Sequence, residues 1–152
     1  QISPTSPKGS FGTTAPYGNQ DAPFKLAELV AAAGASYSAR WTTVQIENLV
    51  LSIKDGLKNP GFSFIEVATQ CPTYFGRKNK LKTPTAMAAV MKANTVFKSA
   101  AARMRPKELE GKIVVGEFAN TQRDEFTENI DKISVEKFGK KTLINSAYEA
   151  EF

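Results

Sequence analysis

Histidine is absent from the 152-residue chain. Its absence excludes Ser-His-Asp and Cys-His catalysis, histidine-ligated zinc and acid–base chemistry based on imidazole. A single cysteine, Cys71, excludes an intrachain disulfide and a metal site built from four cysteines of this chain. Such sparse use of cysteine is typical of a reducing compartment, which predicts the cytoplasm.

Long apolar runs and a secretory signal are also missing. No run of about 18 apolar residues occurs, so the sequence predicts no membrane span. Residues 1–20 are rich in Pro, Ser, Thr and Gly and lack the apolar segment of a signal peptide. The chain is nevertheless 41% hydrophobic and 10% aromatic, so we expect a packed core, and the length suggests one domain or most of one.

The first 20 residues leave two alternatives open. Three prolines interleave with glycines in this stretch, which excludes a regular helix or a central strand. The composition fits a flexible tail, and it also fits an ordered loop that belongs to a larger domain.

After residue 20 the sequence alternates between helical and strand patterns. Helices are predicted over 21–33 and 43–58, and strands over 37–43 and 62–68. The strand over 62–68 is almost continuously apolar, which is typical of a strand covered on both faces. Two strands joined by a helical crossover predict a parallel βαβ unit. Because two strands make a poor sheet, we expect further strands from upstream or from a partner.

Capping residues and spacing extend the prediction along the chain. Asp21 and Thr43 are candidate N-caps of the first two helices. Thr83 and the proline after it predict the start of an Ala-rich helix, which Pro106 stops. A third strand is predicted over 113–118, and apolar residues from 126 to 133 indicate a short amphipathic helix.

Positive charge is concentrated in residues 77–112, which hold ten basic and two acidic residues. The densest part is the loop after Cys71, which contains four cations: Arg77, Lys78, Lys80 and Lys82. Three interpretations are open: a solvated basic face, a nucleic-acid-binding patch, or a docking surface for an acidic protein or an anionic cofactor. No nucleic-acid-binding motif accompanies the charge, which disfavours the second.

Cys71 follows the carboxyl end of the strand over 62–68, the edge where open α/β sheets bind ligands. The residues alone favour a small buried packing residue. A nucleophile is the second alternative, with Arg77 or Lys78 lowering the thiol pKa. A metal ligand is the third, since Cys-Pro occurs at iron–sulfur sites, although the other ligands must come from elsewhere.

Five strings, in this order and spacing, resemble the β subunit of 2-oxoacid:ferredoxin oxidoreductases. The branch that they resemble most is 2-oxoglutarate:ferredoxin oxidoreductase, also called 2-oxoglutarate synthase. The similarity runs from Gln1 to about Ile133. The strings are QISPTSP (1–7), TAPYGN (14–19), AGASYSARWTT (33–43), GFSFIEV (61–67) and CPTYFGRKNK (71–80).

The resemblance implies an α/β fold. The chain would form an incomplete three-layer parallel sheet, the C-terminal part of a thiamine-diphosphate-binding domain. Residues 1–133 would belong to that domain, with 1–20 as the cofactor-side loop and 77–112 as the basic segment. Residues 134–152 would form a C-terminal tail.

The resemblance also implies an activity and its cofactors. Such enzymes decarboxylate a 2-oxoacid oxidatively to an acyl-CoA and pass electrons through a [4Fe–4S] cluster to ferredoxin. Cys71 matches the fourth cluster ligand, and Gln1 matches a residue beside thiamine diphosphate. The Gly-Asp-Gly motif that binds Mg²⁺ and diphosphate, and three cluster cysteines, would lie upstream. We therefore expect this chain alone to bind none of these cofactors and to be inactive.

The partners implied are the N-terminal part of the β subunit, an α subunit, ferredoxin and coenzyme A. Subunits γ and δ are further candidates, and neither nucleic acid nor membrane is expected. The four cations after Cys71 are the candidate docking residues for ferredoxin or coenzyme A. Two alternatives stay open: specificity for pyruvate or branched-chain 2-oxoacids, and a non-catalytic basic α/β interaction module.

Overall fold

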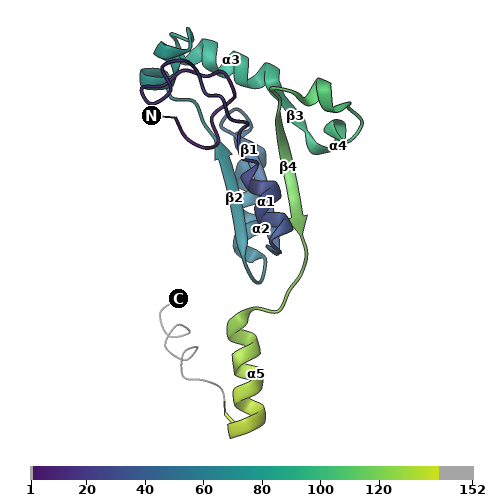
Figure 1. The fold of residues 1–152 in the computed structure, drawn as a ribbon. Helices are drawn as coiled ribbons and strands as arrows, with labels where there is room; N and C mark the ends of the chain where they lie inside the picture. Colours follow the sequence, from purple (N-terminus) through teal and green to yellow (C-terminus); the bar gives the residue numbers. More distant parts are fainter. Residues whose placement is uncertain (1, 141–152) are drawn as a thin grey trace.

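The computed structural model describes residues 2–140 and shows a four-stranded sheet with helices on its faces (Figure 1). Two of its short helical turns are irregular: η1 is a π-helical turn and η2 is a 3₁₀ turn. The elements in chain order are α1 (Leu26–Ala32), β1 (Tyr37–Thr42), α2 (Ile46–Lys58), β2 (Ser63–Ala68), η1 (Pro72–Gly76), α3 (Pro84–Asn94), β3 (Thr95–Phe97), α4 (Lys98–Ala101), η2 (Pro106–Leu109), β4 (Ile113–Asn120) and α5 (Phe126–Phe138).

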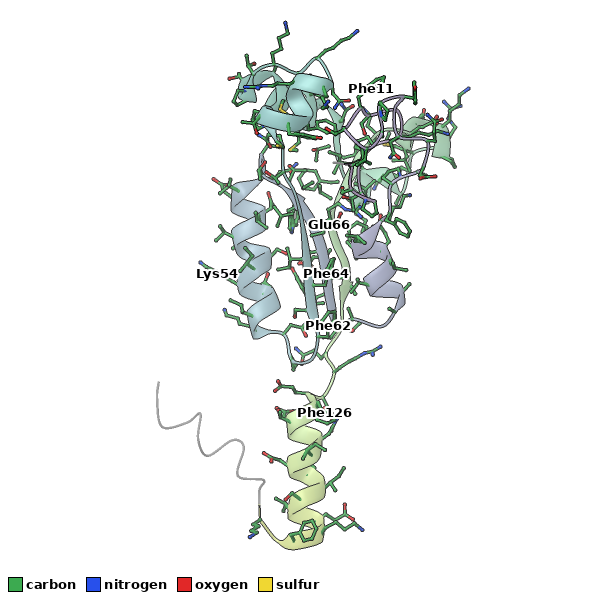
Figure 2. All side chains as sticks on the ribbon, turned by 60° about the vertical axis from the view of Figure 1, so that its left-hand side comes forward. Phe11, Lys54, Phe62, Phe64, Glu66 and Phe126 are labelled. Atoms are coloured by element: carbon green, nitrogen blue, oxygen red, sulfur yellow. The ribbon has the colours of Figure 1, made fainter. Side chains whose placement is uncertain are left out.

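The sheet is mixed, with the strand order β2-β1-β4-β3. The predicted parallel βαβ unit is confirmed, because β1 and β2 pair in parallel through the α2 crossover. The prediction of an all-parallel sheet is wrong, because β4 pairs antiparallel with β1 and parallel with β3. Periodicity identifies a strand but does not give its direction. The α/β class and the three layers hold, since α1 and α2 lie on opposite faces of the sheet (Figure 2).

The core lies on β1, whose six residues are all buried. Its odd-numbered side chains, Tyr37, Ala39 and Trp41, form the apolar cluster with Val115 of β4. The Tyr37 hydroxyl lies 2.7 Å from the Ser52 hydroxyl of α2, so this face of β1 is the one that α2 covers. Alternation of this kind follows from the twofold period of a strand.

The other face of β1 is polar and carries a buried arginine, Arg40. Its guanidinium donates to Glu28 of α1 at 2.6 Å and to Glu66 of β2 at 2.8 Å. It also donates to the Val114 carbonyl of β4 at 3.2 Å and lies over the Phe118 ring. A charge is retained in this interior because carboxylates pair with it, and the network joins one helix to three strands.

The sequence predicts that β2 is covered on both faces, and the structure differs. Its apolar run suggests an interior strand, yet β2 lies at the end of the sheet and most of its residues are half-buried. The interior strands are β1 and β4, which have neighbours on both sides, and all six residues of β1 are buried.

The helix boundaries differ from the predicted caps. The first helix starts at Leu26 after Lys25, so Asp21 is not its cap; Gly34 follows its end with φ +99°. The second starts after Gln45, and the Thr43 hydroxyl instead donates to Gln70. The Thr83 cap is confirmed, because its hydroxyl accepts from the Ala86 N–H at 3.1 Å.

The single helix predicted between residues 84 and 105 is broken. Three consecutive strand-forming residues, Thr95, Val96 and Phe97, leave the helix and pair with β4. The Thr95 hydroxyl and the Asn94 amide donate to carbonyls of the last turn of α3, which ends the helix. Tertiary pairing therefore outweighs the helical propensity of the alanines around it.

The predicted strand over 113–118 and the helix from residue 126 are confirmed as β4 and α5. The latter lies apart from the sheet in Figure 1 and extends to Phe138, so the predicted domain boundary after Ile133 falls inside it. Residues 141–152 of the predicted tail lie outside the described residues, as does Gln1. No helix of the described part is long and apolar enough to cross a membrane.

Candidate functional site

The carboxyl ends of β1 and β2 meet at one edge of the sheet, as a parallel pair requires. Thr43 follows β1, and its N–H donates to the Ala68 carbonyl of β2 at 3.1 Å. Its hydroxyl donates to Gln70 Oε1 at 2.7 Å. These two bonds hold the segment that follows β2. Cys71, which comes directly after Gln70, therefore has a defined position at this edge.

Cys71 is exposed, so the packing role that the residues alone favour is wrong. Its backbone is extended, with φ −118° and ψ 94°, and Pro72 then starts the η1 turn. The Gly76 N–H closes the turn by donating to the Cys71 carbonyl at 2.9 Å. The chain therefore curls around the cysteine side chain.

This turn places hydrogen-bond donors near the Cys71 sulfur. The backbone N–H of Phe75, the Thr73 hydroxyl and the backbone N–H groups of Tyr74 and Thr73 hold the pKa of the thiol below its usual value. The Thr73 hydroxyl lies 3.6 Å from the sulfur. Successive donors of this kind form an anion-binding concavity. The site thus favours a thiolate, the form of cysteine that binds metals.

The four cations predicted as docking residues follow the same turn. Asn79 holds this loop: its N–H donates to the Phe75 carbonyl at 3.0 Å, and its side-chain amide donates to the same oxygen at 2.9 Å. All four side chains are exposed, and none forms an ion pair within residues 2–140. Lys78 lies over the Tyr74 ring, 5.8 Å from its centroid. Their charge is therefore available to an external anion.

The N-terminal loop is ordered and docks on this same region, which decides between the two alternatives left open by composition. Asn79 pairs with both backbone groups of Phe11, accepting from the N–H at 2.8 Å and donating to the carbonyl at 3.0 Å. The Thr13 N–H donates to the Tyr74 hydroxyl at 3.1 Å, and the two hydroxyls also contact each other. Segments more than 60 residues apart thus lie side by side.

The sequence places Cys71 at the carboxyl edge of the sheet, with the basic loop after it, and the structure has both there. The docking of the N-terminal loop on this region was not predicted. Gln1 stays a prediction because it lies outside them. The donors around Cys71 were missed, because backbone N–H groups have no signature in side-chain identity. Asn79 was also missed, although an Asn in a loop is a recognisable backbone-binding residue.

This chain offers one thiolate for a cluster. Within residues 2–140, no group of three or more His, Cys, Asp or Glu side chains could hold a metal ion. An exposed cysteine whose thiol pKa is lowered by nearby donors fits one ligand position of an iron–sulfur cluster, where hydrogen bonds to sulfur are a usual feature. The remaining ligands would have to come from other polypeptide.

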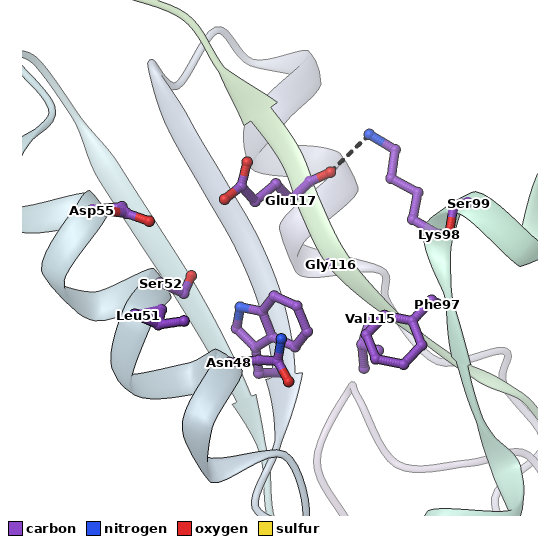
Figure 3. Close-up of a pocket in the computed structure, with 11 residues that line it drawn as sticks. Asn48, Leu51, Ser52, Asp55, Phe97, Lys98, Ser99, Val115, Gly116 and Glu117 are labelled. Atoms are coloured by element: carbon purple, nitrogen blue, oxygen red, sulfur yellow. Dashed lines mark hydrogen bonds between the residues drawn. The ribbon is translucent and has the colours of Figure 1, made fainter.

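A separate cavity of about 410 Å³ lies between α2 and the β3–β4 side of the sheet (Figure 3). Its wall includes Leu51 and Asp55 of α2, Phe97 of β3 and Glu117 of β4. None of the predicted site residues lines it. Trp41, which also contributes, has a buried Nε1 with no hydrogen-bond partner among the described residues.

Comparison with known sequences identifies close relatives. The chain is 57% identical over 148 residues to 2-oxoglutarate synthase subunit KorB of Methanothermobacter marburgensis, which covers 97% of the chain and 52% of the relative. It is 47% identical over 133 residues to KorB of Methanocaldococcus jannaschii, covering 88% of the chain and 49% of the relative. The chain therefore spans about half the length of these relatives. No family model matches it.

Comparison with solved structures supports the fold. The structure of a 2-oxoglutarate:ferredoxin oxidoreductase from Magnetococcus marinus, with 2-oxoglutarate, coenzyme A and succinyl-CoA bound, matches with a TM-score of 0.69. The match covers 100% of this chain and 53% of that chain at 23% identity. The resemblance to 2-oxoglutarate synthase, the 2-oxoglutarate branch of the 2-oxoacid:ferredoxin oxidoreductases, is confirmed by the sequence relatives, and the α/β fold by this structure.

Proposed function

We propose, from its homology to the KorB relatives, that the chain forms part of the β subunit of a cytoplasmic 2-oxoglutarate:ferredoxin oxidoreductase. The reaction is oxidative decarboxylation of a 2-oxoacid to an acyl-CoA, with electrons leaving to ferredoxin. The observation that carries the proposal is the 57% identity over 97% of the chain. Cys71 is in addition an exposed cysteine among N–H donors.

In such an enzyme thiamine diphosphate with Mg²⁺ supplies the carbanion chemistry and a [4Fe–4S] cluster carries single electrons. Cys71 supplies one thiolate ligand. The donors that lower its thiol pKa favour the thiolate form, and the same donors would reduce the negative charge at sulfur in the bound state. The exposed position of Cys71 leaves room for ligands from the rest of the subunit.

The N-terminal loop, residues 1–20, has a second role: it lies beside thiamine diphosphate in the assembled subunit. Asn79 and Tyr74 hold this loop against the segment that follows Cys71. Gln1, at the end of the loop, contributes to the thiamine site by resemblance alone. Because Asn79 and Tyr74 belong to the segment that follows Cys71, the docking holds the cofactor-side loop against that segment.

The four cations after Cys71 form the docking surface for the anionic electron acceptor. They are exposed, follow Cys71 by six to eleven positions and are not neutralised by ion pairs in the described part of the chain. A positive surface of this kind raises the rate of association with an acidic protein, and salt weakens the effect. Ferredoxin fits this surface better than coenzyme A, because electrons must leave near the cluster.

The test of function is substrate-dependent ferredoxin reduction by the assembled complex. The complex is purified anaerobically through a tag on this chain and is given coenzyme A with 2-oxoglutarate, pyruvate or a branched-chain 2-oxoacid. We expect the highest kcat/KM with 2-oxoglutarate. A preference for another 2-oxoacid would correct the substrate, and no reduction with any 2-oxoacid would favour the non-catalytic module.

A further inference from the structure

Among residues 2–140, the side chain that forms a hydrogen bond with the Cys71 sulfur is that of Thr73. Its hydroxyl oxygen lies 3.6 Å from the sulfur, a distance within the range of hydrogen bonds to sulfur. The hydroxyl has no other hydrogen-bond partner in the described part of the chain. A thiolate carries no proton, so in that state the hydroxyl is the donor and the sulfur accepts.

The residues around Cys71 explain why a side chain supplies this donor. Pro72 has no N–H, so the residue next to Cys71 offers no backbone donor. The N–H groups of the three residues that follow, 73 to 75, lie near the sulfur, but none of them caps the η1 turn through a hydrogen bond to the Cys71 side chain. The Thr73 hydroxyl is therefore the donor with hydrogen-bond geometry.

Cys71 and Thr73 lie on one open surface. Both residues are exposed in this chain. The remaining ligands of a cluster would have to approach Cys71 from that open side, because residues 2–140 hold no group of three or more metal-binding side chains. The contact between Thr73 and the sulfur, in contrast, lies wholly within this chain.

A hydrogen bond to a cluster thiolate changes the electron affinity of the cluster. Reduction of a [4Fe–4S]²⁺ cluster to the 1+ state adds one electron and increases the negative charge on its sulfurs. A donor at such a sulfur is therefore bonded more strongly in the reduced state, and hydrogen bonds to the sulfurs are among the factors that set the reduction potential.

We propose that the Thr73 hydroxyl donates to the Cys71 thiolate in the cluster-bound state and raises the reduction potential of the cluster. Thr73 binds no iron and acts through Cys71. The inference rests on the proposed function, since it takes Cys71 as a cluster ligand. It adds that this hydroxyl makes the cluster a better acceptor of the electrons that leave the 2-oxoacid.

A role in holding the turn explains the Thr73 hydroxyl less well. The turn is closed by the backbone, where the Gly76 N–H donates to the Cys71 carbonyl at 2.9 Å. The Thr73 hydroxyl contributes no bond to that closure, because its partner is the sulfur. Removing the hydroxyl should therefore change the sulfur and leave the fold of the turn intact.

The test is an anaerobic redox titration of the assembled complex, followed by electron paramagnetic resonance, with Thr73→Val and Thr73→Ser. Thr73→Val keeps the branched shape and removes the donor, whereas Thr73→Ser keeps the donor. At the midpoint potential of the unsubstituted cluster, the ratio of reduced to oxidised cluster should fall several-fold in Thr73→Val, an effect of the order of one hydrogen bond to a charged acceptor. Thr73→Ser should restore most of that ratio.

Two further readouts separate a hydrogen bond from a long-range charge effect. The shift in Thr73→Val should be the same at low and high salt, because screening acts mainly on exposed charges such as those of Arg77 and Lys78. In D₂O, electron–nuclear double resonance of the reduced cluster should show an exchangeable deuteron that is lost in Thr73→Val and kept in Thr73→Ser.

Three results would overturn the proposal: an unchanged potential in Thr73→Val, an equal shift in both variants, or a shift that disappears at high salt. Loss of the cluster in Thr73→Val would also overturn it, because the hydroxyl would then be needed for assembly and not for tuning.

These outcomes are distinct from failure of the proposed function. A complex that binds the cluster and reduces ferredoxin, but whose potential ignores Thr73, refutes the tuning alone. A complex whose potential shifts as expected, but in which 2-oxoacids give no ferredoxin reduction, refutes the activity alone. A complex without any cluster refutes the ligand role of Cys71 and the tuning with it.

Discussion

Replacing Gly76 with alanine is expected to disrupt the turn that holds the Cys71 thiol. Gly76 is buried, and a Cβ there would overlap the Leu81 carbonyl and lie 2.9 Å from Met87 Sδ. The backbone cannot easily move away. The Gly76 N–H donates to the Cys71 carbonyl at 2.9 Å, and the Leu81 N–H donates to the Gly76 carbonyl at 2.8 Å.

The expected cost follows from these contacts. Overpacking of a filled site costs about 1–3 kcal/mol. Each of the two backbone hydrogen bonds contributes about 1 kcal/mol if it is lost. Gly76→Ala should therefore lower the free energy of unfolding by about 1–3 kcal/mol if both bonds survive and by about 3–5 kcal/mol if both are lost. Gly111→Ala is the control: no atom lies within 4 Å of its Cβ and its φ is +73°, so only backbone strain applies.

Two assays report the effect, urea unfolding and the pH dependence of Cys71 alkylation by iodoacetamide. In the unsubstituted chain the donors of the turn lower the thiol pKa, so the midpoint of the rate profile should lie below that of a free cysteine. In Gly76→Ala the midpoint should rise to the ordinary value, because the thiolate loses its donors. An unchanged midpoint, or a stability loss no greater than that of Gly111→Ala, would refute the reasoning.

Three further experiments test the buried arginine network, the docking of the N-terminal loop and the basic loop. Arg40→Ala leaves two partly buried carboxylates without their cation and should cost about 3–5 kcal/mol in urea unfolding; a loss below about 1 kcal/mol contradicts the network. Asn79→Ala removes the clamp on the N-terminal loop, so amide exchange over residues 2–25 should accelerate about tenfold, and unchanged exchange would show that other contacts hold the loop. Lys78→Glu with Lys80→Glu should raise the KM for ferredoxin several-fold at low salt and less at high salt, whereas Lys58→Glu should not; a salt-independent KM rejects docking at this loop.

Local sequence patterns correctly predicted the elements that are determined by residues only a few positions away in the chain. The spacing of apolar residues gave α1, α2 and α5, and Thr83 with the following proline gave the start of α3. The parallel pairing of β1 and β2 followed because a helical crossover permits no other short connection.

The errors arose where distant parts of the chain decide the outcome. The break at Thr95 depends on β4, which lies almost 20 residues further on. The antiparallel direction of β4 depends on its partner and not on its own residues. The order of the N-terminal loop depends on Asn79 and Tyr74, more than 60 residues away.

The candidate site was located from the sequence, but its chemistry was not. The position of Cys71 after β2 placed it at the ligand-binding edge, and its family role came from resemblance. Its exposure and the N–H groups that lower its pKa are properties of backbone geometry. No pattern of side chains encodes them.

The most direct test of the central claim is electron paramagnetic resonance of the dithionite-reduced complex, with and without Cys71→Ser. Cys71 is the only thiol of this chain, so the substitution removes its whole contribution to a cluster. The account predicts a [4Fe–4S] signal in the unsubstituted complex. In Cys71→Ser the signal and the iron content should fall in proportion, while thiamine diphosphate content is retained. A signal of unchanged shape and intensity in Cys71→Ser would contradict the assignment of Cys71 as a cluster ligand.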